Sequence, residues 1–136
     1  MKNDVERVLF TKEEISEKVK YLANQIKCAY EDKNPLILCI LKGSLIFTAD
    51  LVRELDFPCT IDFMQVSSYG NGSETTGKLK IKKDMDSDVN GRDVIIVEDI
   101  VDTGITLNTI VKLLKHRGAR SVEIACLLNK EARRVV

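Results

Sequence analysis

The fold is decided by the stretch VIIVEDIVDTGIT, residues 94–106. Four β-branched apolar residues come first, two adjacent acids follow, and Asp102 and a glycine precede residues with helical spacing. Such a short apolar run predicts a strand over 93–97 that is buried on both faces, as in parallel sheets. The apolar spacing after it predicts a helix over 106–117, ended by Gly118. Strand, polar turn and helix in this order favour an α/β fold.

The rest of the chain repeats this alternation. Thr11 and Glu14 form a capping box, which starts a helix that ends near Tyr30. Apolar runs and their Gly and Pro breakers predict a second helix over 44–55 and strands over 36–41, 60–66, 79–81 and 122–128. We therefore expect a mainly parallel sheet flanked by helices, in a single domain over 1–136.

Composition excludes several classes of function. The 136 residues include 21 basic and 21 acidic side chains, a balance that argues against nucleic acid as a partner. No apolar run approaches the roughly 20 residues that span a bilayer, and the first residues hold no apolar secretory core. The four cysteines lack C-x-x-C spacing, which is typical of reduced thiols. We expect a cytoplasmic protein without a membrane partner.

The acids at 84, 86 and 88 resemble a calcium-binding loop only at first sight. Such a loop needs glycine after the third acid and glutamate at its twelfth position, where this chain has Val89 and Ile95. We expect a solvated acidic turn. The glycine-rich stretch over 67–77 is typical instead of a long functional lid.

The polar residues after the strand over 93–97 predict a site for a phosphorylated sugar. Ligands of open α/β sheets bind at the carboxyl ends of strands, where Glu98 and Asp99 are expected. Two neighbouring acids need a positive or hydrogen-donating partner, such as a sugar diol or a hydrated Mg²⁺. The turn over 102–106 offers backbone amides at a helix N-terminus, which suits a phosphate, and Gly104 permits close approach. A helix cap alone would need only one of these acids.

Several motifs together resemble a known family. The stretch over 97–107 resembles the phosphoribosyl pyrophosphate (PRPP) loop of type I phosphoribosyltransferases. The sequences LKGS at 41–44, SSY at 67–69 and LLNK at 127–130 resemble, in order and spacing, further motifs of the hypoxanthine-guanine phosphoribosyltransferases. The resemblance covers essentially the whole chain. It implies the Rossmann-like fold of type I phosphoribosyltransferases.

The resemblance also implies a role for each matching residue. Glu98 and Asp99 would hold the ribose hydroxyls and the Mg²⁺ shell, and Asp102 would be the general acid/base toward purine N7. The 5′-phosphate would be bound by Thr103, Gly104, Ile105 and Thr106. Lys42 and Gly43 would bind pyrophosphate in a loop that often holds a non-proline cis peptide bond. Ser68 and Tyr69 would belong to the lid, and Lys130 would donate to the purine 6-oxo group.

The implied reaction converts PRPP and hypoxanthine or guanine to IMP or GMP and pyrophosphate, with Mg²⁺ as cofactor, in a homodimer or homotetramer. Family members continue for tens of residues past the strand that carries Lys130, and their later part supplies an aromatic residue that stacks on the purine. This sequence has no Phe, Tyr or Trp after Tyr69. Two alternatives stay open: a PRPP-binding regulatory protein without turnover, and a catalytically weak fragment.

Overall fold

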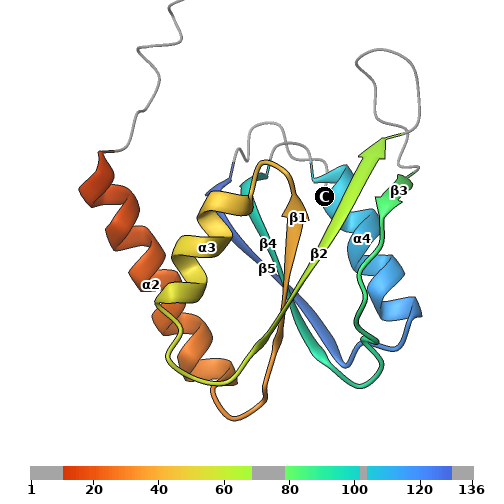
Figure 1. The fold of residues 1–136 in the computed structure, drawn as a ribbon, viewed down its shortest axis with the longest axis horizontal. Coiled ribbons are helices and arrows are strands. Elements are labelled where there is room, and N and C mark those ends of the chain that lie inside the picture. The colour runs from red at the N-terminus through yellow and green to blue at the C-terminus, as the bar shows by residue number, and fades with distance from the viewer. Residues whose placement is uncertain (1–10, 69–78, 102–103, 130–136) are drawn as a thin grey trace, which may run out of the picture.

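One five-stranded sheet with helices on both faces forms the protein. The computed structural model describes residues 11–68, 79–101 and 104–129. Its elements are α2 (Lys12–Tyr30), β1 (Leu36–Leu41), α3 (Leu45–Arg53), β2 (Thr60–Ser68), β3 (Leu79–Lys83), β4 (Asp93–Val101), α4 (Ile105–His116) and β5 (Ser121–Asn129). The strand order is β3-β2-β1-β4-β5, and only β3 runs antiparallel to its neighbour (Figure 1). The predicted α/β fold with a mainly parallel sheet is confirmed.

The central strand β1 separates two hydrophobic layers. It pairs in parallel with β2 along one edge and with β4 along the other, and helices cover both of its faces. Leu36, Leu38 and Ile40 pack toward α4, whereas Ile37 packs with residues of α2 and α3. Each such side chain contributes about 1.5–3 kcal/mol on full burial. The apolar run therefore places the carboxyl end of β1 in the middle of the sheet.

Helix α2 begins where the capping box predicts. The Thr11 amide donates to Glu14 Oε1 at 2.8 Å, and the Glu14 amide donates to Thr11 Oγ1 at 3.0 Å. Val19, Ala23 and Ile26 form its buried stripe, at the three- and four-residue spacing of one helical face. This stripe covers the same face of the sheet as α3.

Element ends differ from the predictions in several places. Strand β4 continues to Val101 instead of ending at residue 97, because it remains paired with β5 as far as the pair Val101–Asn129. Strands β2 and β3 each extend two residues further than predicted, and β5 gains one residue at each end. Helix α3 begins one residue later than predicted, at Leu45, and ends two residues earlier, at Arg53. Helix α4 begins at Ile105, one residue before the predicted start.

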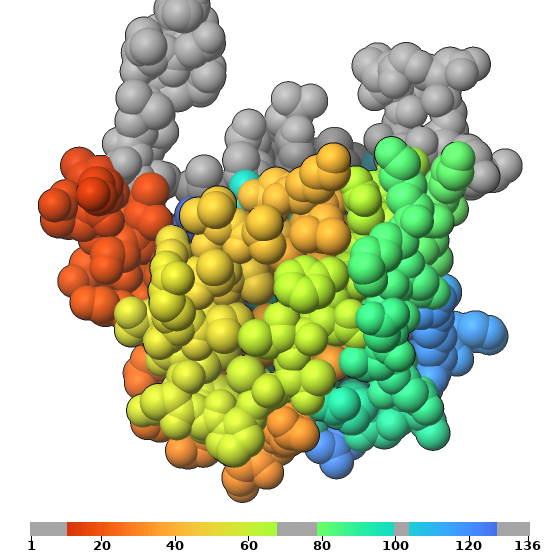
Figure 2. Space-filling model, in the orientation of Figure 1, coloured from red at the N-terminus to blue at the C-terminus, as the bar shows by residue number. Residues whose placement is uncertain are grey.

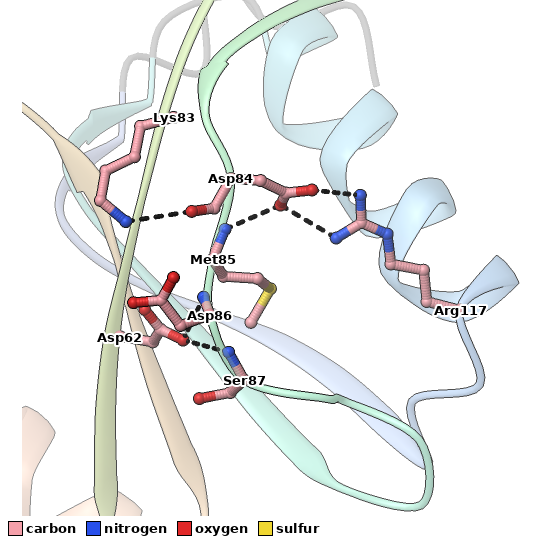
Figure 3. Close-up of polar contacts among 7 residues, drawn as sticks. All are labelled: Asp62, Lys83, Asp84, Met85, Asp86, Ser87 and Arg117. Carbon is pink, nitrogen blue, oxygen red and sulfur yellow. Dashed lines mark hydrogen bonds and ion pairs between the residues drawn. The ribbon is translucent and has the colours of Figure 1, made fainter.

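A short segment after β3 crosses the α4 side of the sheet. The buried carboxylate of Asp62 on β2 accepts the backbone amides of Asp86 and Ser87 at 3.0 and 2.7 Å (Figure 3). The two terminal guanidinium nitrogens of Arg117, at the end of α4, donate to the Asp84 carboxylate at 3.0 and 2.8 Å. The acidic turn is exposed as predicted, and it also joins β2 to α4.

Strand β3 lies at one edge of the sheet. It forms the margin of the face seen in Figure 2, beside β2. Its side chains at Lys80, Lys82 and Lys83 are exposed. Within the described ranges, no helix combines the length and the apolar character that crossing a membrane requires.

Candidate active site

The predicted site residues of β1 and β4 lie at the carboxyl ends of these two strands, on the same side of the sheet. These two strands are parallel neighbours, so their carboxyl ends lie side by side (Figure 1). The β1 end leads into Lys42 and Gly43, and the β4 end carries Glu98 and Asp99. Parallel pairing thus brings together two motifs that are more than fifty residues apart in the sequence.

The turn between β1 and α3 is tight. The Leu41–Lys42 peptide bond is cis, as the resemblance predicts for this loop. The Leu45 amide donates to the Lys42 carbonyl at 3.1 Å, which closes the turn. A Cβ atom placed on Gly43 would lie 3.8 Å from each carboxylate oxygen of Asp99. The Gly43 backbone therefore lies against the Asp99 carboxyl group, with ordinary contact distance to spare.

Glu98 and Asp99 belong to the strand itself and not, as predicted, to the turn after it. Residues 95 and 97 pack toward α2 and α3, and residues 94 and 96 pack toward α4. Asp99 continues this alternation and lines a cavity on the α2–α3 side. The sequence-based interpretation missed this placement because it ended the strand at residue 97.

Glu98 carries the largest described pKa change at this edge. Burial, and after it the hydrogen bond with Asp99 and the negative charge of that residue, raise the pKa of Glu98 to about 8. The Asp99 amide donates to Glu98 Oε1 at 3.1 Å and lowers this pKa only in part. No described cation lowers it. The two carboxyl groups thus form an acidic pair that lacks positive charge, which a cation or hydroxyl donors would supply.

Two carboxylates suit Mg²⁺, which binds proteins through one or two carboxylates and keeps water or phosphate oxygens as its other ligands. Among the described residues, no group of three or more His, Cys, Asp or Glu side chains is placed to hold a metal ion. The acidic pair supplies the one or two carboxylates that such an ion needs from the protein.

The turn before α4 has the backbone shape of an anion-binding helix start. Gly104 is the N-cap residue and has φ +87°, a left-handed conformation that favours glycine. Its carbonyl accepts the Asn108 amide at 2.9 Å. Ile105 and Thr106 occupy the first turn of α4, where the direction of the backbone amides and the helix dipole favour an anion.

Four predicted site residues lie outside the described residues: Tyr69, Asp102, Thr103 and Lys130. Ser68 is the last residue of β2, and the structure describes its backbone only. The described elements nevertheless fix where these residues attach. Asp102 directly follows β4, and Lys130 directly follows β5, the parallel neighbour of β4.

A cavity of about 560 Å³ reaches this edge from the α2–α3 side. Gly43 and Asp99 form part of its wall, together with Lys12, Ile15, Ser16 and Val19 of α2, Ile46, Phe47, Asp50 and Arg53 of α3, and the neighbouring Glu54 and Leu127. Sequence reasoning missed these lining residues. Their local spacing only indicates two amphipathic helices and gives no sign that they enclose a space beside Asp99.

Comparison with known proteins places the chain in a family. Residues 9–136 match the family model of the phosphoribosyl transferase domain. The chain belongs to this family. As a phosphoribosyl transferase domain it is similar to the hypoxanthine-guanine phosphoribosyltransferase of Bacillus subtilis (strain 168), with 47% identity over 134 residues. That match covers 98% of this chain and 74% of the relative.

A second relative and a solved structure show the same similarity to phosphoribosyl transferase domains. The hypoxanthine-guanine phosphoribosyltransferase of Streptococcus thermophilus (strain CNRZ 1066) is 46% identical over 136 residues, which are 100% of this chain and 76% of the relative. The crystal structure of a hypoxanthine phosphoribosyltransferase from Staphylococcus aureus superposes with a TM-score of 0.93 at 44% identity, covering 98% of this chain and 73% of that one. The resemblance predicted from the motifs is confirmed.

Proposed function

We propose that this chain transfers the 5-phosphoribosyl group of PRPP to hypoxanthine or guanine and thereby serves purine salvage. One observation carries the proposal: the parallel pairing of β1 and β4 places Gly43 of one predicted motif against Asp99 of another. The similarity to enzymes named hypoxanthine-guanine phosphoribosyltransferases, along nearly the whole chain, supports the same reaction.

The PRPP side of the site would use both strand ends. The N-terminus of α4, with Thr103 and Thr106, would bind the 5′-phosphate, because the helix dipole favours an anion there. Glu98 and Asp99 would face the ribose hydroxyls, which donate the hydrogen bonds that this acidic pair lacks. Lys42 and Gly43 would bind the pyrophosphate group, since an ammonium group and exposed backbone suit a leaving anion.

The purine side would use residues that follow β4 and β5. Lys130 would donate to the 6-oxo group, which selects hypoxanthine and guanine over a 6-amino purine. In the transfer, purine N9 bonds to C1′ of the ribose, the bond from C1′ to the pyrophosphate oxygen breaks, and Asp102 accepts the proton that leaves N7. Its place in the sequence, directly after β4 and three residues past Asp99, supports this role. Ser68 and Tyr69 would cover the site and exclude water.

Mg²⁺, when bound, would neutralise charge on the pyrophosphate group. We propose Glu98 and Asp99 as the side chains that hold its hydration shell, since burial and mutual repulsion leave this pair short of positive charge. A homodimer or homotetramer in the cytoplasm completes the proposal, and the four cysteines, which form no disulfide within the described residues, are in keeping with a reducing compartment.

Product formation tests this function. The chain is incubated with PRPP, Mg²⁺ and hypoxanthine or guanine, and IMP, GMP and pyrophosphate are measured by chromatography. We expect both nucleotides, each in a one-to-one ratio with pyrophosphate. Adenine serves as the control base and should give no product. Calorimetric binding of Mg²⁺-PRPP without any nucleotide formation contradicts the transfer reaction and favours a regulatory PRPP-binding protein.

A further inference from the structure

Ser44 lies fully buried beneath the proposed pyrophosphate loop, although both of its neighbours, Gly43 and Leu45, are exposed. It occupies the N-cap position of α3, yet its side chain makes no capping hydrogen bond. Its hydroxyl instead donates to the Ile40 carbonyl at 2.5 Å and lies 3.4 Å from Cys39 Sγ. The hydroxyl thus bonds back to the strand that the chain has just left.

This hydrogen bond sits where β1 separates from β4. The parallel register of these strands ends at the pair Cys39–Val97, one residue before Ile40. Strand β4 continues beyond that pair and carries Glu98 and Asp99. The Ser44 hydroxyl supplies the Ile40 carbonyl with a donor at the first position past the ladder. Ile40 keeps its register with Met64 of β2, and the bond from the Ser44 hydroxyl adds a second constraint on the end of β1 where β4 departs.

The same separation makes room for the loop. Between Ile40 and Ser44 the chain turns back on itself, and the Leu45 amide closes the turn on the Lys42 carbonyl at 3.1 Å. Gly43 then lies against the Asp99 carboxyl group. The backbone at Lys42 and Gly43 is therefore held by two hydrogen bonds, one from the Ser44 hydroxyl and one from the Leu45 amide.

We propose that Ser44 is a positioning residue for pyrophosphate: its hydroxyl holds the Lys42–Gly43 loop in the shape that binds the anion beside Asp99. The inference rests on the proposed function and adds a residue to which that function assigned no role. Ser44 itself is buried and does not touch the substrate. Its loss should weaken the binding of PRPP and pyrophosphate and leave the purine side unchanged.

The chain offers a matched control on the same helix. Thr48, one turn further along α3, is also buried, and its hydroxyl has no hydrogen-bond partner among the described residues. Thr48→Val removes a hydroxyl of the same helix at constant shape and touches no loop bond. Ser44→Ala removes the bond to Ile40. Ser44→Thr keeps the hydroxyl and adds a methyl group at a fully buried position, so it should lower the thermal midpoint but preserve the loop.

Three measurements separate positioning from a merely structural role. Hydrogen exchange of the Leu45 amide in the whole chain should become about tenfold faster in Ser44→Ala, and binding of Mg²⁺-pyrophosphate, measured by calorimetry, should weaken about tenfold, as one net hydrogen bond predicts. KM for hypoxanthine should stay unchanged. Thr48→Val should match the wild type in all three, and Ser44→Thr should match it in pyrophosphate affinity despite its lower thermal midpoint.

Unchanged exchange at Leu45 in Ser44→Ala overturns the inference. Faster exchange with unchanged pyrophosphate affinity also overturns it, because the order of the loop would then not matter to the anion. Equal weakening in Ser44→Thr shows that affinity follows stability, which again contradicts positioning. A wild-type chain that makes no IMP or GMP, but shows both expected changes, refutes the transfer reaction and leaves the role of Ser44 in pyrophosphate binding supported.

Discussion

Strand β4 carries carboxylates near both ends, and the two ends surround them differently. Asp93, at its start, is buried and accepts hydrogen bonds from the Arg120 guanidinium and, at 2.7 Å, from the Ser121 hydroxyl. These partners, Arg120 foremost, lower the pKa of Asp93 to about 2. Glu98, five residues later, has burial and the Asp99 carboxyl group around it, and its pKa rises to about 8.

The contrast separates an acid that stabilises the fold from acids that are suited to bind a ligand. A buried carboxylate with an arginine and a hydroxyl stabilises the folded chain. An acidic pair without a described cation destabilises it, and a strand retains such a pair where a ligand supplies the missing charge or donors. The two ends of one strand thus separate structure from the proposed chemistry. Substitutions at either end can test that separation.

The largest effect is expected just beyond the acidic end. Asp102→Asn keeps the shape of the side chain but removes the proposed proton acceptor, so kcat should fall about 1,000-fold. PRPP affinity should change little. Steady-state kinetics give kcat, and calorimetry gives the affinity for Mg²⁺-PRPP. Equal losses in both quantities would assign Asp102 to binding instead of proton transfer.

The acidic pair should come next. Glu98→Gln combined with Asp99→Asn should lower kcat/KM for PRPP about 100-fold, as expected when the groups around a metal ion are lost. Without Mg²⁺ and PRPP, the double variant should be at least as stable as the wild type, because repulsion between the two acids is removed. Asp86→Asn, which removes one exposed acid from the turn after β3, is the control for the loss of an acid away from the pair and should change neither quantity.

The same double variant has a pH signature in the free energy of unfolding. The folded pKa of Glu98 lies above its ordinary value of 4.5, so the folded state holds a proton that the unfolded state has released. The wild type should therefore lose stability as pH rises from about 4.5 to about 8. Denaturant unfolding across this range should show a flatter profile for the double variant. An identical profile in both chains would mean that Glu98 is ionised in the folded protein.

The smallest effect belongs to the opposite end. Asp93→Asn should lower the free energy of unfolding by about 2 kcal/mol at pH 7, the value of the drop in pKa from 3.8 to about 2, and leave kcat unchanged. The lowered pKa stabilises the fold fully above pH 4, and this contribution is lost as pH falls toward 2. The difference from the wild type should shrink over that window in urea titrations. A loss of kcat with unchanged stability would remove the distinction between the two ends.

Local signals predicted the parts of the fold that local interactions build. The capping box gave the start of α2, and the apolar run at 36–41 gave both ends of β1. The predicted end of β4 was wrong because acids usually mark the end of a buried strand. Pairing with Leu128 and Asn129 of β5 extends this strand to Val101. Cross-strand pairing of that kind leaves no mark in the neighbouring sequence.

The site divides in the same way. Motifs predicted which residues gather at the strand ends, since parallel strands bring their carboxyl ends to one edge. The closeness of Gly43 to Asp99, the place of Asp99 on the α2–α3 side, and the bond from Ser44 to Ile40 all needed the structure. Each depends on where β1 and β4 part, and that point follows from the packing of the whole sheet.

The lysines of β3 have a consequence for how the protein behaves among copies of itself. An unpaired strand edge offers amides and carbonyls to any other extended chain, and it is a common starting point for aggregation. On β3 the exposed ammonium groups of Lys80, Lys82 and Lys83 line that strand. If a second copy paired with this edge, like charges would come together and lose their hydration, which costs free energy. The lysines of β3 therefore oppose the edge-to-edge pairing with which fibril formation begins.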